Sequence, residues 1–425
     1  MGKVIILNEE DRKEAEKLLR EFKGDRYAFG DGALKKVGPY AAELGKRIAI
    51  VADTYIKGGP VAEEIEGSIR SAGAEVIDTY DGARANAPRE DLYRLAFQVT
   101  KNDPDGVVVV GGGSTIDAAK ASLVLKLYGG LIDDYFGTGL VTEKSGGEQI
   151  PLVAVQTASS SSAHLTKYSN ITDLVTGQKK LIVDESIVPK ASVYQYDVSR
   201  TMPPGFTKDG ALDGVAHCWE VWMGATGKPN YDKISDVAYL GIKLIVENIK
   251  DVVADGNDME ARYAMGLGTD LGGYSIMLGG TNGGHLGSFS LVDLLAHGRG
   301  CAVLNPYYTV LFSDAIQDQL KRLAPVFETA GCADGISKLE GRELAEGVAG
   351  GMIALSKSID FPVSLKEAGA PHERLEKMIE AAKNPQLKMK LQNMPTPMDA
   401  DAGDVDKLMA PTLEAAYTGD LSLIP

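Results

Sequence analysis

The sequence contains few cysteines and no excess of basic residues. The three cysteines among 425 residues, Cys218, Cys301 and Cys332, are widely separated, which excludes a disulfide framework and fits a reducing compartment. The formal net charge of −15 argues against nucleic-acid binding, because such proteins carry a basic surface. No apolar run reaches the roughly 18 residues of a membrane span, so we expect no nucleic-acid partner and no membrane association.

The N-terminal segment also lacks the apolar core of a signal peptide, since acidic residues begin at Glu9. We therefore expect a cytoplasmic protein. A chain of 425 residues is longer than one hydrophobic core usually fills, which predicts two domains.

The first half alternates between patterns typical of strands and of helices. Short apolar runs predict strands at 47–53, 74–80, 106–114 and 150–157, with helical segments between them. This alternation predicts a parallel sheet covered by helices on both faces. We assign residues 1–198 to an α/β dinucleotide-binding domain.

From about residue 200 the pattern becomes helical. Long segments of helical period follow one another with few strand signals, for example at 207–225, 230–253 and 258–278. We therefore predict an all-α domain over residues 199–425, joined to the first domain near "SRTMPPGFTKDG".

A glycine turn follows the most apolar of the predicted strands. The segment reads "VVVVGGGSTIDAAK", in which glycines allow a phosphate to approach the backbone and the following helix offers free N–H groups. The spacing is neither GxGxxG nor the Walker pattern, and a simple tight turn is the alternative. Asp53 ends another strand, where a carboxylate binds a ribose 2′-hydroxyl and repels a 2′-phosphate. This favours NAD over NADP, unless Asp53 is a turn or cap residue.

Histidines are scarce, and most lie in the helical half. Asp213 and His217 are four residues apart, which places both on one face of a helix. The pair suits a divalent metal or, alternatively, a helix-stabilising contact. His285 and His297 follow in a glycine-rich stretch, and His164 follows a serine-rich turn. Imidazoles with one carboxylate suit Zn²⁺ or Fe²⁺.

Together these segments resemble the iron-containing (group III) alcohol dehydrogenases, which are related to glycerol dehydrogenases and dehydroquinate synthases. "GGGSTIDAAK" is close to the signature of that family, and "TASSSSAHLTKYSNITD" aligns without gaps with another of its motifs. The resemblance extends from residue 27 to the C-terminus. The residues that it implies as cofactor contacts are Gly111, Gly112, Gly113, Ser114, Asp117, Thr157, Ser161 and Lys179. His164 stands where the family usually has Glu.

The resemblance also implies a metal site. "TKDGALDGVAH" supplies Asp213 and His217 as the first two ligands, and "AHGRGCAVLNP" supplies His297 as the last. The family usually has two histidines before that last ligand, whereas this chain has only His285. His285 is therefore either the third ligand, which we favour, or the catalytic imidazole of a proton relay.

The implied activity is reversible hydride transfer between a small alcohol and NAD. The alcohol is oxidised to an aldehyde, and in the reverse direction the aldehyde is reduced. The metal acts as a Lewis acid on the substrate oxygen, and His164 contacts the substrate or its proton path. The resemblance further implies a homo-oligomer. Two alternatives are a lyase of the dehydroquinate synthase type and a non-catalytic binding protein on this fold. The lyase usually has Glu at the position of Asp213.

Overall fold

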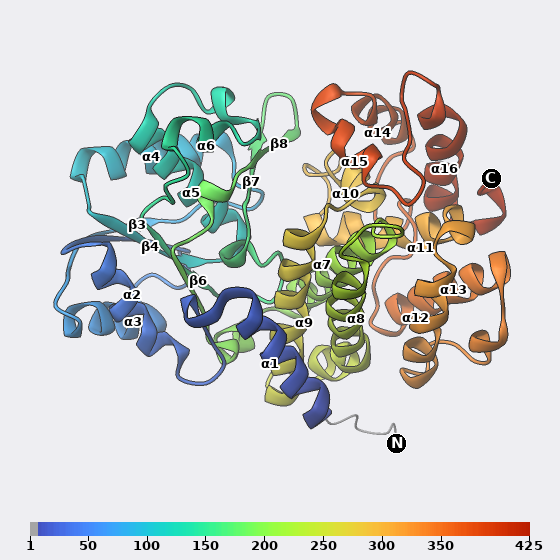
Figure 1. The fold of residues 1–425 in the computed structure, drawn as a ribbon, viewed down its shortest axis with the longest axis horizontal. Helices are drawn as coiled ribbons and strands as arrows, with labels where there is room; N and C mark the ends of the chain where they lie inside the picture. Colours follow the sequence, from blue (N-terminus) through green and yellow to red (C-terminus); the bar gives the residue numbers. More distant parts are fainter. Residues whose placement is uncertain (1–6) are drawn as a thin grey trace. The chain divides into compact units, whose positions relative to one another are not determined.

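The computed structural model describes residues 7–425. Contacts divide the chain into two compact units (Figure 1). One comprises residues 19–201, and the other comprises residues 7–18 with 202–425. The first six residues, which form part of the segment used to argue against a signal peptide, lie outside the described residues. None of the helices in the described part is long and apolar enough to cross a membrane.

The α/β unit is built on a six-stranded sheet in which every neighbouring pair of strands is parallel. The strand order is β1-β9-β6-β4-β2-β3. The strands are β1 (Tyr27–Phe29), β2 (Arg47–Ala52), β3 (Glu75–Asp81), β4 (Gly106–Gly111), β6 (Leu152–Gln156) and β9 (Ala191–Tyr194). The parallel sheet predicted from the sequence is confirmed.

Helices cover both faces of this sheet. They are α2 (Val37–Leu44), α3 (Pro60–Ser71), α4 (Arg89–Asn102) and α5 (Gly113–Tyr128). Val107 and Val109 of β4 share a core with α4 and α5, whereas Val108 and Val110 share one with α2 and α3. Successive side chains of a strand point to opposite faces, so burial on both faces explains the unbroken run of valines.

A second, smaller sheet belongs to the same unit. It contains β5 (Gly137–Thr138), β8 (Gln178–Val183) and β7 (Tyr168–Asp173) in that order, and β7 and β8 form an antiparallel pair. The short helix α6 (Leu140–Ser145) follows β5. None of these three strands is predicted from the sequence, because they mix polar and apolar residues.

The second unit is helical, as predicted, and no strand lies within residues 202–425. Helices α7, α8 and α9 pack against one another. The helices of this unit after residue 202 are α7 (Pro204–Met223), α8 (Tyr231–Ala254), α9 (Met259–Leu278), α10 (Gly283–Ser288), α11 (His297–Leu311), α12 (Gln317–Thr329), α13 (Gly341–Ser358), α14 (Arg374–Ala382), α15 (Lys388–Gln392) and α16 (Ala410–Thr418).

The first part of α1 (Glu9–Lys23) also belongs to the helical unit. Asp11 forms an ion pair with Lys243 of α8, and the Arg12 guanidinium lies 4.0 Å from the ring centre of Tyr263 on α9. These contacts attach residues 9–18 to the α8–α9 pair.

Candidate functional site

The helical unit brings one carboxylate and three imidazoles together. Helix α7 carries Asp213 and His217 one turn apart, α10 carries His285, and His297 is the first residue of α11. The distances from Asp213 Oδ1 to the three Nε2 atoms are 4.0 Å for His217, 3.9 Å for His285 and 4.0 Å for His297. Three of the four side chains are buried, and the His297 side chain is 21% exposed.

These distances are too long for hydrogen bonds, and several atoms of the cluster have no other partner. Asp213 Oδ1, His217 Nδ1 and His285 Nε2 are buried without a hydrogen-bond partner among residues 7–425. Buried polar atoms without partners are costly and rare. Two atoms that each lie about 2.1 Å from a shared ion can be up to about 4.2 Å apart. The cluster therefore fits a divalent metal.

Glu220 orients His285 within this cluster. The fully buried Glu220 carboxylate accepts hydrogen bonds from His285 Nδ1 at 2.9 Å and from the backbone N–H groups of Asn282 at 2.8 Å and His285 at 3.2 Å. Burial opposes a charged Glu220, but His285 and these hydrogen bonds lower the pKa of the carboxyl group. The charged carboxylate thus holds the proton of His285 on Nδ1, and Nε2 faces Asp213.

Two glycines permit the close approach of the three helices. A Cβ at Gly284 would lie 2.5 Å from a Glu220 carboxylate oxygen. A Cβ at Gly298 would lie 2.1 Å from the Asp209 carbonyl oxygen and 2.7 Å from Asp213 Cβ. Side chains at these positions would force α10 and α11 away from α7, so the glycines next to His285 and His297 serve packing.

Besides Glu220, two further residues of the cluster were not predicted from the sequence. Cys301 lies one turn after His297 on α11, with Sγ 4.0 Å from His297 Nε2. Lys390 of α15 is buried and donates a hydrogen bond to the Thr281 hydroxyl. Burial lowers the pKa of Lys390 to about 8, and the charges of Glu220 and Cys301 act in the opposite direction.

The sequence carries a signal for some of these additional residues. Glu220 is three residues after His217, and Cys301 is four after His297, so helical spacing places each beside a predicted ligand. Lys390 is remote in sequence from every other residue of the cluster. No local pattern connects it to them.

The predicted nucleotide-binding residues gather at one edge of the α/β unit. Asp53 follows β2, Gly111 ends β4 and Thr157 follows β6, and these three strands are neighbours in the sheet. From β2 the chain passes to the edge strand β3 and returns to β4 on the other side of β2. Open α/β sheets bind ligands at such a switch point, beyond the carboxyl ends of the strands.

Asp53 is tied to the glycine turn. Its carboxylate accepts a hydrogen bond from the Gly112 N–H at 3.0 Å and another from the Thr115 hydroxyl. Burial raises the pKa of Asp53, whereas these hydrogen bonds lower it. A Cβ at Gly111 would lie 2.8 Å from the Asp53 carboxylate, but one at Gly112 would have no heavy atom of the described residues within 4 Å. The space in front of Gly112, at the N-terminus of α5, is therefore open.

Two buried oxygens near this turn have no partner. Ser161 Oγ and Asp117 Oδ1 are buried without a hydrogen-bond partner in the described part of the chain. The other oxygen of Asp117 accepts hydrogen bonds from the Asn170 backbone at 3.0 Å and side chain at 3.2 Å. Burial raises the pKa of Asp117, while Lys120 and Lys179 act against this. The partnerless oxygens and the open glycine turn fit a polar ligand such as a dinucleotide.

The remaining predicted contacts have partners within the unit. Ser114 Oγ accepts a hydrogen bond from the Asn86 N–H at 3.0 Å. The Thr157 hydroxyl lies 3.1 Å from the Tyr55 hydroxyl. The hydroxyl groups of both residues therefore have hydrogen-bond partners on other segments of this unit.

His164 occupies a different environment from the one predicted. Its imidazole is 0% exposed, and Nε2 lies 3.2 Å from the Tyr27 hydroxyl. The rings of Tyr27 and Tyr194 pack against it with centroid distances of 5.3 and 5.8 Å. Burial lowers the pKa of His164 well below its usual value. The ring is thus enclosed by core residues, and its contact with substrate stays a prediction.

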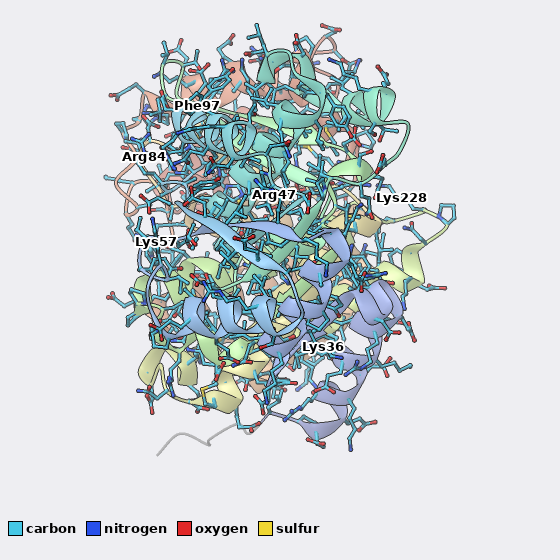
Figure 2. The ribbon with its side chains drawn as sticks, turned by 90° about the vertical axis from the view of Figure 1, so that its left-hand side faces the viewer. Lys36, Arg47, Lys57, Arg84, Phe97 and Lys228 are labelled. Atoms are coloured by element: carbon cyan, nitrogen blue, oxygen red, sulfur yellow. The ribbon has the colours of Figure 1, made fainter. Side chains whose placement is uncertain are left out.

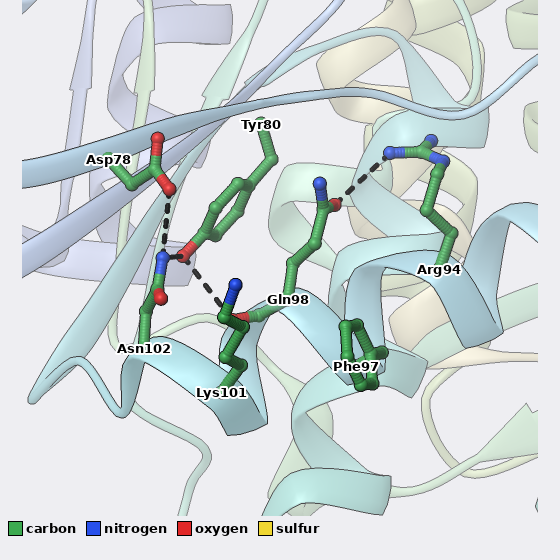
Figure 3. A pocket seen from close by; sticks show the side chains of 7 residues that line it. All are labelled: Asp78, Tyr80, Arg94, Phe97, Gln98, Lys101 and Asn102. Atoms are coloured by element: carbon green, nitrogen blue, oxygen red, sulfur yellow. Dashed lines mark hydrogen bonds between the residues drawn. The ribbon is translucent and has the colours of Figure 1, made fainter.

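An open pocket of the α/β unit lies elsewhere. It is located between β3 and α4, where Phe97 is 69% exposed (Figures 2 and 3). Asn102 hydrogen-bonds to Asp78 at 2.8 Å and to the Tyr80 hydroxyl at 2.7 Å in its wall. The lining residues are Asp78, Tyr80, Arg94, Phe97, Gln98, Lys101 and Asn102. None of them is a predicted site residue.

Comparison with known proteins agrees with this arrangement. The NAD-dependent methanol dehydrogenase of Bacillus methanolicus is 28% identical over 351 residues, which cover 82% of this chain and 89% of the relative. Long-chain-alcohol dehydrogenase 1 of Geobacillus thermodenitrificans is 27% identical over 404 residues, which cover 92% and 95%. The alcohol dehydrogenase from Oenococcus oeni has the same fold, with a TM-score of 0.79 at 24% identity, covering 92% of this chain and 98% of that chain.

Two family models match consecutive parts of the chain. Residues 24–196 match the model of iron-containing alcohol dehydrogenases, and residues 207–410 match the C-terminal model of the Fe-containing alcohol dehydrogenase family. The two matches include both the glycine turn and the carboxylate–imidazole cluster. The chain therefore belongs to the iron-containing alcohol dehydrogenase family.

Proposed function

We propose that the protein catalyses reversible hydride transfer between a small alcohol and NAD, with a divalent metal held by Asp213, His217, His285 and His297. Family membership supports the reaction class. The names of two relatives, an NAD-dependent methanol dehydrogenase and a long-chain-alcohol dehydrogenase, support an alcohol substrate. The observation that carries the metal assignment is that Asp213 Oδ1 and His285 Nε2, 3.9 Å apart, are both buried without a hydrogen-bond partner among residues 7–425.

The charge and orientation of the residues in the cluster favour binding of a cation. Burial lowers the pKa of His217 to about 4, so this imidazole is neutral near pH 7 and keeps a lone pair for a metal. Asp213 supplies the negative charge, and Glu220 directs the Nε2 atom of His285 toward it. A divalent metal bound here would polarise the substrate oxygen as a Lewis acid. The partly exposed His297 leaves one side of the cluster accessible.

His285 acts in this proposal as a ligand and not as the proton relay. Its Nδ1 donates to Glu220, and its Nε2 is buried at 3.9 Å from Asp213 Oδ1. A histidine that binds a metal commonly donates its second N–H to a carboxylate. The arrangement of His285 follows that pattern.

The glycine turn is the proposed position of the cofactor pyrophosphate. Gly112 faces open space at the N-terminus of α5, where helix N–H groups favour a phosphate. Asp53 is the proposed selector of NAD over NADP, because its carboxylate would repel a 2′-phosphate. The hydride chemistry belongs to the nicotinamide, and the protein positions and orients it.

The alternatives have less support. The family match favours an alcohol dehydrogenase over a dehydroquinate synthase-type lyase. The complete carboxylate–imidazole cluster argues against a non-catalytic binding protein on this fold.

The test is an oxidation assay with the metal-loaded protein. Protein supplied anaerobically with Fe²⁺ or Zn²⁺ is mixed with NAD and a panel of primary alcohols and diols, and NADH absorbance is followed. We expect NADH formation with at least one alcohol and its loss in Asp213→Ala. Asp236→Ala, which removes an exposed carboxylate of α8, should keep the activity. Protein that binds metal and NAD yet converts no alcohol or aldehyde would contradict the proposal.

A further inference from the structure

Cys301 lies against the proposed metal centre and is not explained by the ligand set above. It is 0% exposed on α11, one turn after His297. One donor atom each from Asp213, His285, His297 and Cys301 lie within 4.8 Å of one another. The four atoms form a compact group, and His217 Nε2, 4.0 Å from Asp213 Oδ1, adjoins it as a fifth donor.

We propose that Cys301 is a sulfur ligand of this metal centre, acting with Asp213, His285 and His297. The inference rests on the proposed function, because it requires a metal at this cluster. A sulfur ligand lies about 2.3 Å from zinc and a nitrogen ligand about 2.1 Å, so the two can be up to about 4.4 Å apart. The distance of 4.0 Å between Cys301 Sγ and His297 Nε2 satisfies this limit.

The neighbouring atoms point to a ligand in this space independently of the cysteine. Asp213 Oδ1 and His285 Nε2 are buried, and neither has a hydrogen-bond partner within residues 7–425. Both residues are at least 95% buried as side chains. Their polar atoms converge on the same volume as the Cys301 sulfur. A cation in that volume would satisfy all of them.

The charges of the cluster suit a thiolate. Cysteine binds metals as the thiolate and releases its proton. One thiolate and the Asp213 carboxylate would neutralise a divalent cation, which is favourable in a buried site. The remaining buried charges, Lys390 and Glu220, are opposite in sign.

A thiolate ligand has a consequence for metal choice. Soft sulfur ligands favour zinc and similar ions, whereas carboxylate and water ligands suit Mg²⁺ and Mn²⁺. Cys301 would therefore raise the preference of this centre for zinc-like ions over Mn²⁺. Replacement of Cys301 by serine should weaken zinc binding at least about tenfold. Even the loss of a residue that only hydrogen-bonds to a ligand lowers metal affinity about 10–100-fold.

The test uses cobalt(II) bound to the full chain. Wild-type protein with one equivalent of Co²⁺ should show a near-ultraviolet sulfur-to-cobalt charge-transfer band, which is absent in Cys301→Ser. Cys332→Ser, which changes a partly exposed cysteine elsewhere in the unit, should keep the band. A cobalt complex of the wild type without this band, or a band that persists in Cys301→Ser, would overturn the inference while the metal centre stands. Wild-type protein that binds no cobalt would overturn both.

A second measurement needs no variant of the cluster. The rates of alkylation of Cys301 and Cys332 by iodoacetamide are measured by peptide mass spectrometry with and without bound zinc. We expect zinc to slow the alkylation of Cys301 at least tenfold and to leave the rate of Cys332 unchanged. Equal rates for Cys301 in the zinc-bound and metal-free protein would overturn the inference.

Discussion

His285 Nδ1 lies 2.9 Å from Glu220 Oε1, and the same imidazole presents its Nε2 at 3.9 Å from Asp213 Oδ1. The carboxylate of Glu220 thus determines which nitrogen of His285 faces the carboxylate–imidazole cluster. It also accepts the backbone N–H groups of Asn282 and His285, so it fixes the start of the short helix α10. One buried residue positions both the ring and the backbone of a proposed ligand.

Glu220→Gln should weaken metal binding about 10–100-fold, as is usual for the loss of a carboxylate that orients a histidine ligand. The measurement is competition for Zn²⁺ against a chelator of known affinity. Glu247→Gln, on α8 and half-buried, is the matched control and should leave zinc affinity unchanged. Equal zinc affinities for Glu220→Gln and the wild type would refute the orienting role of Glu220.

Gly112→Ala should abolish tight NAD binding without unfolding the protein. The added Cβ meets no atom of the described residues within 4 Å, so the fold tolerates it, and the cost at a helix N-cap is about 1 kcal/mol or less. The methyl group would nevertheless occupy the space proposed for the pyrophosphate. Isothermal titration with NAD provides the measurement. Gly67→Ala in α3, which also has open space, is the control, and NAD binding by Gly112→Ala with wild-type affinity would count against the pyrophosphate position.

Asp53→Asn should raise the NADP-to-NAD preference, because it removes the negative charge that repels a 2′-phosphate while keeping the shape of the side chain. The ratio of kcat/KM values for the two cofactors measures this change. Asp78→Asn removes the same charge from the pocket between β3 and α4 (Figure 3) and should leave the ratio unchanged. An unaltered ratio in Asp53→Asn would mean that Asp53 serves only the glycine turn.

His164 should make the metal-free protein less stable in acid. Burial holds its folded-state pKa well below the usual value of 6.5, so on acidification the unfolded chain takes up a proton that the folded protein does not. The stability is therefore present above pH 6.5 and is lost as the pH falls below it, by up to about 1.4 kcal/mol per pH unit.

Urea unfolding of metal-free protein between pH 7.5 and pH 5, values chosen to bracket the usual pKa, tests this expectation. His164→Gln should lose less free energy of unfolding across this range than the wild type. His372→Gln, which changes an exposed histidine paired with Glu414, should behave as the wild type. An identical pH slope in His164→Gln and the wild type would show that His164 is not a buried neutral histidine.

The sequence predicts the fold well where the pattern is long or fully buried. The valine run of β4 and the helical periods of α7, α8 and α9 all correspond to elements of the structure. The small sheet of β5, β8 and β7 escapes prediction, because pairing between segments depends on tertiary contacts that local patterns do not contain. The segment that contains β8 resembles any other half-buried strand until its partner β7 is known.

The candidate site shows the same limit. Asp213 and His217 are predictable because one helical turn separates them, and Cys301 could have been inferred from His297 by the same spacing. A histidine after a strand is typical of an open loop, whereas Tyr27 and Tyr194 enclose the ring of His164, and local sequence does not contain these contacts. Lys390 is invisible, since only the tertiary fold brings it near Glu220 and Cys301.

A metal titration of activity tests whether alcohol oxidation depends on a metal bound at the carboxylate–imidazole cluster. Metal-free protein is titrated with Zn²⁺ or Fe²⁺ at saturating NAD and alcohol while NADH formation is recorded. We expect no activity without metal, a linear rise up to one equivalent per chain and no further increase, with no rise in Asp213→Ala. Full activity of rigorously metal-free protein, or activity of Asp213→Ala equal to the wild type, would contradict this expectation.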